Sequence, residues 1–217
     1  GSPDVVHVHY AGHGSQVDDV SGDESDGLDE TLVPVDGRTP GVPDILDDEL
    51  DAIFARLRTP HALIVLDSCH SGTATRSFEV RTRAVPRDTR VDLYRRIAAD
   101  AAAGGAPAAN ATPAATATRA IVPRLGTRQL VMSAAASHQE ALDGPVDGRY
   151  HGFFSYALAR SLSSAPPTAG AREVFAGIAR ELARIQQRFG RSSMPEPQLE
   201  GPPARLDAPL LAPVAMN

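Results

Sequence analysis

The sequence predicts an α/β fold in which a mostly parallel sheet is flanked by helices. Three segments indicate it: an apolar run at Val5–Tyr10, an amphipathic stretch at about 46–57, and a continuous apolar run at Ala62–Leu66. A strand, a helix and a second strand in this order form a βαβ unit, which makes the two strands parallel. The length of 217 residues suits one domain or one and a half.

The first predicted strand, Val5–Tyr10, is rich in β-branched and aromatic residues and stops at the glycine-flanked turn AGHG at 11–14. Residues 15–44 are acidic and interrupted by glycine and proline, which is typical of a loop or a hairpin. Apolar residues at helical spacing then predict a helix over about 46–57, and Pro60 ends it.

The second predicted strand, Ala62–Leu66, has the uninterrupted apolar composition of a strand that is buried on both faces. It runs directly into the motif DSCHSG at 67–72. Residues 73–128 begin with a cluster of arginines and continue into an alanine- and proline-rich stretch. Because such a stretch cannot bury enough apolar surface to offset the entropy of ordering it, we expect a flexible linker.

Regular structure is predicted again after this linker. Gln129–Ser133 has the composition of a third strand, and His151–Leu162 and Arg172–Phe189 are predicted helices. The second of these helices places its apolar residues on one stripe, which indicates a core-facing helix. The proline-rich tail from Met194 onward is expected to be coil that covers the surface.

Charge is unevenly distributed along the chain. The net charge is −6, but residues 18–51 alone carry −12, with Arg38 as their one basic residue. A solvated acidic loop, a cation site and a surface that receives basic substrates all agree with this pattern.

The sequence has no basic stripe with interleaved aromatic residues, which argues against nucleic-acid binding. It also has no membrane-length apolar run and no signal-peptide pattern, so we expect a cytoplasmic protein without membrane contact.

Cys69 is the single cysteine, which excludes an intramolecular disulfide and a zinc site with paired thiolates. His13 and Cys69 follow the two predicted parallel strands, whose ends lie about 4.8 Å apart in a sheet. A histidine beside a lone cysteine forms a candidate base and nucleophile. The glycines around them leave backbone N–H groups free for an oxyanion hole. The alternative is an inert core cysteine and a surface histidine.

Four ordered motifs resemble the caspase-like cysteine peptidases, most closely their metacaspase and bacterial orthocaspase branch. They are YAGHGSQ at 10–16, DGLDE at 26–30 with Pro34 and Asp36, DDEL at 47–50, and DSCHSG at 67–72. A weaker resemblance to the small subunit of this family covers 129–133, 152–162 and 197–201.

The resemblance implies a caspase-like three-layer sandwich. It divides the chain into a large-subunit-like part at 1–72, the linker at 73–128 and a small-subunit-like part at 129–217. The family has strands and a helix before the strand that bears the histidine. We therefore expect N-terminal strands to be missing from this chain. A separate N-terminal segment would supply them, and a regulatory domain is a further candidate partner.

The resemblance also implies a role for each matching residue. Cys69 would be the nucleophile, His13 the general acid and base, and the N–H groups of Gly14 and Cys69 the oxyanion hole. Asp67 would line the pocket for the residue before the scissile bond. A carboxylate that faced the sulfur would raise the pKa of the thiol, so Asp67 is expected to face a cationic substrate group instead. Arginine is its natural partner, with lysine as a second choice.

Calcium is the one cofactor that the resemblance suggests. Several metacaspases use Ca²⁺, and Asp29, Asp47 and Asp48 stand where acidic ligands are expected. Arg76 occupies the position after the cysteine motif where a further acidic ligand would fall.

The predicted function is a caspase-like cysteine endopeptidase that cleaves after Arg and processes itself in the linker. Its substrates would be proteins or peptides with Arg before the scissile bond. The alternatives are a catalytically silent binding module in a bacterial regulatory or defence system, and a different hydrolase or acyltransferase with the same dyad. The candidate self-cleavage residues are Arg76, Arg81, Arg83, Arg87, Arg90, Arg95, Arg96, Arg119 and Arg124.

Overall fold

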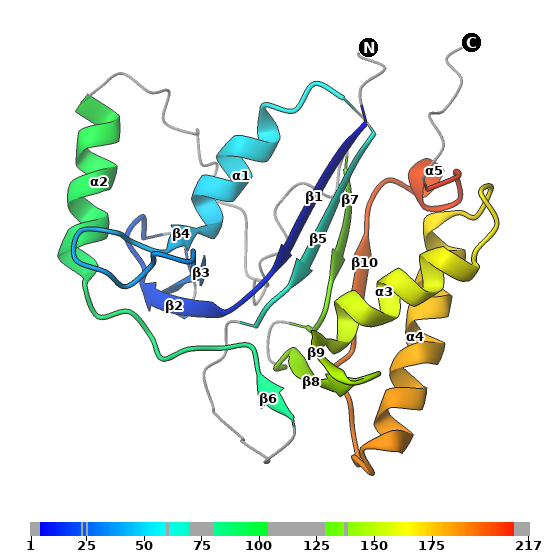
Figure 1. The fold of residues 1–217 in the computed structure, drawn as a ribbon. Coiled ribbons are helices and arrows are strands. Elements are labelled where there is room, and N and C mark those ends of the chain that lie inside the picture. Colours follow the sequence, from blue (N-terminus) through cyan, green and yellow to red (C-terminus); the bar gives the residue numbers. More distant parts are fainter. Residues whose placement is uncertain are drawn as a thin grey trace.

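The computed structural model describes residues 5–22, 24, 26–59, 61–69, 80–103, 129–136 and 139–210. Its central sheet has four strands, in the order β1 (Val6–Ala11), β5 (Ala62–Asp67), β7 (Leu130–Ser133) and β10 (Gln198–Glu200). The first three strands are parallel, and β10 runs antiparallel to β7 (Figure 1). The predicted α/β fold with a mostly parallel sheet is therefore confirmed.

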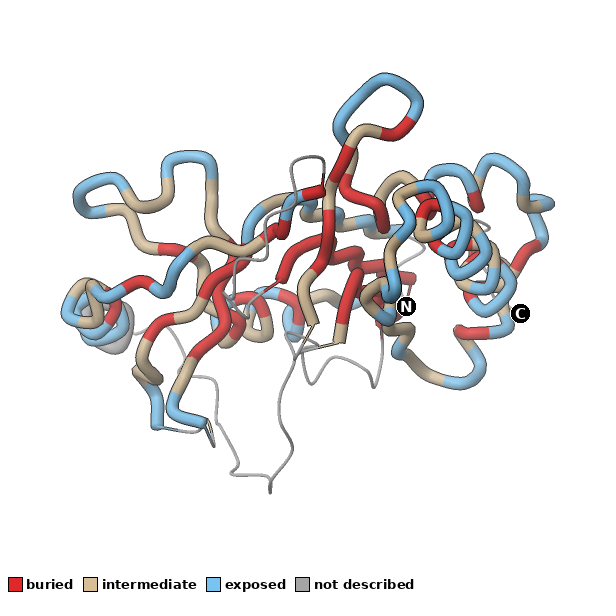
Figure 2. Tube along the Cα trace, turned by 90° about the horizontal axis from the view of Figure 1, so that it is seen from below, coloured by how far each residue is buried: buried red, intermediate tan, exposed pale blue. Residues whose placement is uncertain are grey.

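Helices cover both faces of this sheet, which gives three layers (Figure 1). On one face lies α1 (Asp47–Ala55), whose buried residues pack with alternate residues of β5. On the other face lie α3 (Phe153–Ser164) and α4 (Ala171–Arg188). Every residue of β5 is buried, and Figure 2 shows buried residues concentrated in the strands at the centre. The continuous apolar run of this strand is explained by its contact with both helical layers.

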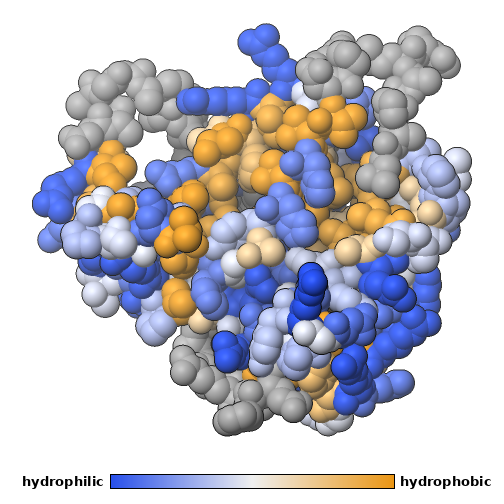
Figure 3. Space-filling model, in the orientation of Figure 1, coloured by the Kyte–Doolittle hydropathy of each residue, from blue (hydrophilic) through white to orange (hydrophobic). Residues whose placement is uncertain are grey.

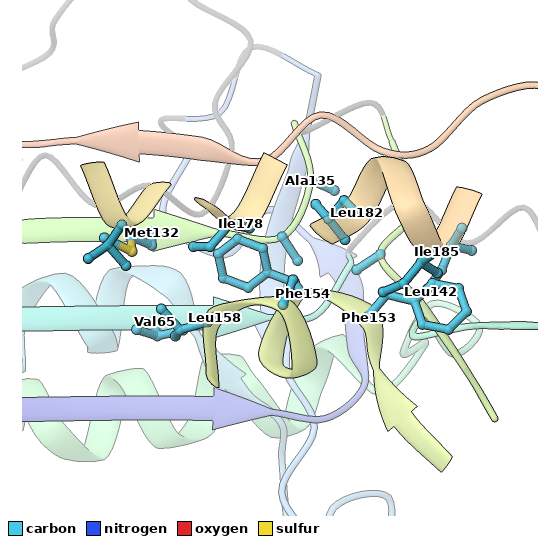
Figure 4. Close-up of a cluster of buried hydrophobic side chains, with 14 of the residues drawn as sticks. Val65, Met132, Ala135, Leu142, Phe153, Phe154, Leu158, Ile178, Leu182 and Ile185 are labelled. Atoms are coloured by element: carbon cyan, nitrogen blue, oxygen red, sulfur yellow. The ribbon is translucent and has the colours of Figure 1, made fainter. Parts of the chain in front are cut away.

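The larger of the two cores lies between the sheet and the helices α3 and α4. Figure 4 shows Phe154, Leu158 and Ile178 of these helices beside Val65 and Met132 of the strands. The stripe of apolar residues on α4 faces this core, as its spacing predicts. The core fixes the start of α3 against the end of β5, where the candidate site lies.

Two small sheets lie at the end of the central sheet to which β1 and β5 point (Figure 1). One contains β2 (Gly14–Asp18), β3 (Leu28–Leu32) and β4 (Ile45–Leu46). The other contains β6 (Arg81–Thr82), β8 (Leu142–Val146) and β9 (Arg149–Gly152). The remaining helices are α2 (Val91–Ala103) and α5 (Pro203–Leu206). The predicted strands and helices outside these sheets are confirmed to within two residues at each end.

Two parts of the small-subunit-like region differ from the sequence-based expectation. The tail from Met194 was expected to be coil only, but β10 adds a strand to the central sheet. The hairpin of β8 and β9 was not predicted, although its turn, Asp147-Gly148, is a typical hairpin turn sequence. Both turn residues have positive φ, 50° and 79°, which this turn type requires.

The central part of the predicted linker also has regular structure, because residues 80–103 form β6 and α2. Asp88 organises this stretch: it accepts hydrogen bonds from Arg90 and from the Tyr94 hydroxyl. Burial would raise the pKa of Asp88, but these hydrogen bonds and the nearby Arg38 charge lower it below its usual range. The Arg-rich stretch is thus ordered by acidic partners, several of them far away in the sequence. The rest of the predicted linker, 73–79 and 104–128, lies outside the described residues.

The acidic segment is one source of these partners. Arg87 forms an ion pair with Asp18, and Arg90 donates to the carbonyl oxygens of Thr39 and Val42. Part of the negative charge at 18–51 is therefore balanced from within the chain, rather than by solvent alone.

The outer face shows apolar residues over the area of α1 and β1 (Figure 3). β1 pairs only with β5 among the described strands, and its residues alternate between half-buried and exposed. Among the residues that the structure describes, no helix combines the length and the apolar composition that crossing a bilayer requires.

Candidate active site

The turns that carry His13 and Cys69 lie at the same end of the central sheet. β1 and β5 pair in parallel up to Ala11 and Asp67, which are direct partners in the register. His13 and Cys69 each follow this last pair by two residues. The carboxyl ends of parallel strands are where α/β proteins place their sites. The topology therefore brings the predicted nucleophile and base to one edge of the sheet.

Cys69 is buried, with 2% of its surface exposed. Its Sγ donates a hydrogen bond to the carbonyl oxygen of Ala141 at 3.5 Å. Burial raises the pKa of the thiol to about 12, although backbone hydrogen bonds with Ala141 and Arg83 act in the opposite direction. The thiol is therefore neutral near pH 7, and a base must take its proton before it can act as a nucleophile.

The His13 turn is held by the half-buried phenol of Tyr10. The Tyr10 hydroxyl lies 2.7 Å from the carbonyl oxygen of His13 and 2.8 Å from that of Val33. Burial raises the pKa of Tyr10 to about 12, so the phenol keeps its proton and remains a donor. A Cβ at Gly12 would lie 2.5 Å from this hydroxyl oxygen, which explains the glycine. His13 itself is exposed, so its ring is accessible to a substrate.

The two backbone N–H groups predicted to form the oxyanion hole share one acceptor. The Gly14 N–H donates to the carbonyl oxygen of Arg83 at 2.9 Å, and the Cys69 N–H donates to the same oxygen at 3.4 Å. Two fixed donors that converge on one carbonyl oxygen can stabilise the negative charge that develops there when the carbonyl carbon is attacked.

Asp67 is fully buried and lies beside the Arg83 guanidinium. Nε of Arg83 is 3.7 Å from Asp67 Oδ1, and Nη1 is 3.9 Å from Asp143 Oδ2. Nε also donates to the Gly12 carbonyl oxygen at 3.3 Å. Burial raises the pKa of Asp143 above its usual value, although the charges of Arg83, His13 and Arg81 act in the opposite direction. Two carboxylates and a carbonyl thus form a pocket that suits a guanidinium.

The Asp67 carboxylate is oriented by α3. Its Oδ2 accepts a hydrogen bond from the backbone N–H of Ser155 at 3.0 Å, in the first turn of that helix. Free N–H groups and the helix dipole both favour a negative charge there. The end of β5 and the start of α3 therefore fix the carboxylate with one oxygen on the helix and the other toward the guanidinium.

Gly152 forms a wall of this pocket. A Cβ built at Gly152 would overlap Asp67 Oδ2 and lie 2.5 Å from Arg83 Nη1. Its φ of −61° is one that alanine adopts readily, so backbone conformation does not require glycine here. The requirement is the space that the Asp67 carboxylate and the Arg83 guanidinium occupy.

Replacing Gly152 by alanine should therefore damage the pocket without unfolding the protein. Forcing one methyl group into a filled site costs about 1–3 kcal/mol. For the Arg-directed peptidase activity expected from the sequence, this predicts a loss of kcat/KM of roughly 5- to 150-fold. Steady-state kinetics would measure it, with the melting temperature as the control for folding. Unchanged kinetics in a correctly folded variant would show that a substrate side chain does not enter this space.

The acidic segment gathers carboxyl groups near the start of α1. Asp29, Glu30 and Asp47 are buried. Burial, followed by the charges of neighbouring carboxylates, raises the pKa of Glu30 and of Asp47 to about 8. Yet among the described residues no three such side chains are arranged to hold a metal ion. Asp29 instead accepts a hydrogen bond from the Val20 N–H at 2.9 Å, and Asp48 is half-buried.

The structure thus brings together Cys69, Gly14, Asp67 and Arg83, with His13 at the same edge. Arg76, Arg119 and Arg124 lie outside the described residues. Arg81 is exposed and lies over the ring of Tyr150, 5.3 Å from its centroid, and not in the pocket. Sequence analysis missed Ala141, Asp143 and Gly152, and the hairpin turn at 147–148 was the signal that could have located their strands.

Comparison with known proteins identifies relatives of this arrangement. Residues 1–77 match the family described as metacaspase, peptidase C14 domain. Metacaspase-1B of Aspergillus terreus is 47% identical over 73 residues, which cover 33% of this chain and 19% of that protein. Metacaspase-1A of Aspergillus fumigatus is also 47% identical over 73 residues, covering 33% of this chain and 17% of that protein. The matched part thus spans less than a fifth of the length of these curated relatives.

A solved structure extends the similarity to nearly the whole chain. The crystal structure of protein GSU0716 from Geobacter sulfurreducens matches with a TM-score of 0.58 and 25% sequence identity, covering 97% of this chain and 72% of that chain. The sequence matches include the turns of both His13 and Cys69, and the fold comparison adds the remaining layers. Residues 1–77 are therefore similar to the metacaspase, peptidase C14 domain, and the fold as a whole is similar to that of GSU0716.

Proposed function

We propose that this protein is a cysteine endopeptidase that cleaves peptide bonds after arginine. One observation carries the proposal: Arg83 has its carbonyl oxygen on the N–H groups of Gly14 and Cys69 while its guanidinium lies beside Asp67. An arginine is thus held at both ends, next to the one cysteine. The metacaspase relatives support the same class of enzyme.

In the proposed reaction His13 takes the proton of the Cys69 thiol, and the sulfur attacks the carbonyl carbon of the substrate arginine. The oxyanion is held by the N–H groups of Gly14 and Cys69. The carbon–nitrogen bond then breaks, and His13 gives its proton to the leaving amine. Water hydrolyses the thioester, with His13 as the base, and the thiol is restored.

The pocket supports a preference for arginine over other residues. Asp67 and Asp143 present two carboxylates to one guanidinium, which offers several donors in a fixed plane. Lysine has the charge but only one nitrogen, so it should be a weaker substrate. An aspartate before the scissile bond would meet two like charges in a buried site, which is strongly unfavourable.

A digest of a peptide library, with the cut sites identified by mass spectrometry, tests this function. Cleavage should follow Arg, and more weakly Lys, and cleavage after Asp should not be detected. A profile dominated by Asp would contradict the role of Asp67. If no peptide is cleaved and a thiol-reactive peptide ending in Arg does not label Cys69, the silent binding module becomes the better hypothesis.

Self-processing in the predicted linker is part of this proposal. The segment after Cys69 is connected directly to the site and carries arginines at high effective concentration. Because Arg83 reaches the pocket in the same chain, no second molecule is needed to supply a substrate.

We further propose that calcium influences this protein through the carboxylates around Asp29, Asp47 and Asp48. The pKa values of Glu30 and Asp47, raised to about 8 by burial and mutual repulsion, support it. A raised pKa means that the folded state holds its proton more tightly than the unfolded chain. The stabilisation is complete below about pH 4 and is lost as pH rises through 8. Chelator-treated protein should therefore melt at progressively lower temperature from pH 5 to pH 9.

Calcium should reverse this loss at pH 8 and have little effect at pH 5.5, where Glu30 and Asp47 already hold their protons. Differential scanning fluorimetry with and without Ca²⁺, and with Mg²⁺ as the control ion, measures the melting temperature at each pH and its shift with calcium. If Ca²⁺ does not change the melting temperature at pH 8, the calcium proposal is contradicted, whereas the predicted pH dependence is unaffected.

A further inference from the structure

Residues 80–88, which we call the occluding segment, run in extended form between the two small sheets. On one side Arg81 and Thr82 pair antiparallel with β8, and the Arg83 N–H donates to Ala141 O at 3.0 Å. On the other side the Val85 N–H donates to Gly14 O at 3.0 Å, and the Asp88 N–H donates to Gln16 O at 2.8 Å. The segment is therefore bonded along both edges, as a peptide would be that binds by strand addition.

The sulfur of Cys69 lies beside the main chain of this segment. Sγ of Cys69 and the N–H of Arg83 both donate to the carbonyl oxygen of Ala141, at 3.5 and 3.0 Å. The N–H of Cys69 reaches the Arg83 carbonyl oxygen directly. Within the described residues, Arg83 is the arginine whose carbonyl group, amide group and guanidinium all contact the site.

We propose that the occluding segment is a built-in substrate: the Arg83–Ala84 bond is the bond that the protein cuts in itself, and until then the segment excludes other substrates. This inference rests on the proposed peptidase function and adds its processing site and its regulation. It selects Arg83 over Arg81, which is two residues away, exposed and outside the pocket.

The cut follows the same chemistry as any other substrate. The sulfur of Cys69 forms a bond to the carbonyl carbon of Arg83, and the bond from this carbon to the nitrogen of Ala84 breaks. The leaving nitrogen receives the proton that His13 took from the thiol. One water molecule then hydrolyses the thioester, which leaves a carboxylate on Arg83 and an amine on Ala84.

Exclusion follows from the groups that the segment occupies. The two N–H donors, the Asp67 carboxylate and the Ala141 carbonyl are all engaged by Arg83. Upstream of this bond Arg81 and Thr82 are anchored to β8, and the Arg83 carbonyl accepts from the Gly14 N–H. Downstream of it the Val85 N–H is anchored to the Gly14 carbonyl of β2. While the Arg83–Ala84 bond is intact, each anchor holds the other half in place. Cutting the bond separates them and lets Arg83 leave the pocket.

Two variants test the cut and the exclusion separately. In Arg83→Ala the guanidinium anchor is removed, so the chain should stay uncut at this bond but hydrolyse an Arg peptide without delay. In Ala84→Pro the arginine stays in the pocket, and the proline ring crowds the leaving nitrogen. The Ala84 N–H makes no bond to Gly14, whose partners are Arg83 and Val85, so proline should be accommodated. This variant should stay uncut and hydrolyse the peptide at less than about a tenth of the Arg83→Ala rate.

Arg81→Ala is the matched control, because it removes the neighbouring arginine from the same strand. Intact-mass spectrometry of wild type and Arg81→Ala should show fragments 1–83 and 84–217, with peptide hydrolysis rising as these fragments appear. A cut elsewhere that persists in Arg83→Ala would overturn the processing site. A rate in Ala84→Pro equal to that of Arg83→Ala would overturn the exclusion. If no variant cuts itself or any peptide, the proposed function itself is wrong, and this inference falls with it.

Discussion

Replacing Cys69 by alanine should abolish both peptide hydrolysis and self-processing. Loss of a catalytic nucleophile reduces kcat by about six orders of magnitude where the whole machinery depends on it. The fold should persist, because the substitution removes one sulfur from a well-packed cluster and costs about 1 kcal/mol. The variant should therefore remain a single full-length chain with a melting temperature within a few degrees of the wild type.

His13→Ala should reduce the rate by a smaller factor, about 10²–10⁴-fold, because a general acid and base contributes that much. The thiol with its pKa of about 12 needs a base most at neutral pH. The defect should therefore shrink as pH rises toward 10, where hydroxide can take over part of this task.

His7→Ala offers the control for both variants. His7 lies on β1, the strand that leads into the His13 turn. It is exposed, and its ring is 5.9 Å from that of His9. It should retain wild-type turnover. If Cys69→Ala or His13→Ala also retains wild-type turnover with a normal circular dichroism spectrum, the dyad is assigned to the wrong residues.

The parts of the site that could be predicted from the sequence are those set by local pattern. The runs at β1 and β5 end in glycine-flanked turns, and the parallel pairing of these strands places His13 and Cys69 at one edge. Asp67 could be predicted as well, since the last residue of a strand is fixed relative to the turn that follows it.

The parts that could not be predicted depend on pairing over long sequence separations. Ala141, Asp143 and Gly152 reach the site only because β8 pairs with β6 and β9, and their sequence carries no catalytic pattern. The occluding segment looked like a flexible stretch because its stabilising partners, among them Gly14 and Asp18, lie about 70 residues earlier. Composition gives the number of charges in a segment but not which of them form ion pairs in the fold.

The same contacts connect charge distribution with regulation. The acidic segment holds the downstream half of the arginine-rich stretch through Asp18 and through the carbonyl groups that receive Arg90. Raising the ionic strength should weaken the exposed pair of Arg87 and Asp18 more than the buried contacts of Arg83. Salt should therefore loosen the segment without releasing the pocket.

Replacing Asp67 by asparagine should remove most of the selectivity for arginine. The carboxylate is fully buried, and its loss leaves a guanidinium with one remaining carboxylate, Asp143, at 3.9 Å. Breaking one partner of a buried charge pair costs about 2–5 kcal/mol, which corresponds to a loss in kcat/KM of roughly 30- to 5,000-fold for Arg peptides. Asparagine still has an oxygen that can accept the Ser155 N–H, so the start of α3 should stay intact.

Asp143→Asn is the matched variant for this prediction, because it removes the other carboxylate of the same pocket. Asp143 is partly exposed and lies farther from the guanidinium than Asp67. Its loss should therefore cost only about 0–1 kcal/mol of transition-state binding, which lowers kcat/KM by up to about fivefold. Self-processing supplies a second readout, since Arg83 occupies this pocket in the uncut chain. The rate at which intact Asp67→Asn disappears should fall by a factor similar to that for the peptide, and both should fall less in Asp143→Asn. Equal rates in Asp67→Asn and the wild type, for the peptide and for the self-cut alike, would show that the carboxylate at the end of β5 does not select the arginine.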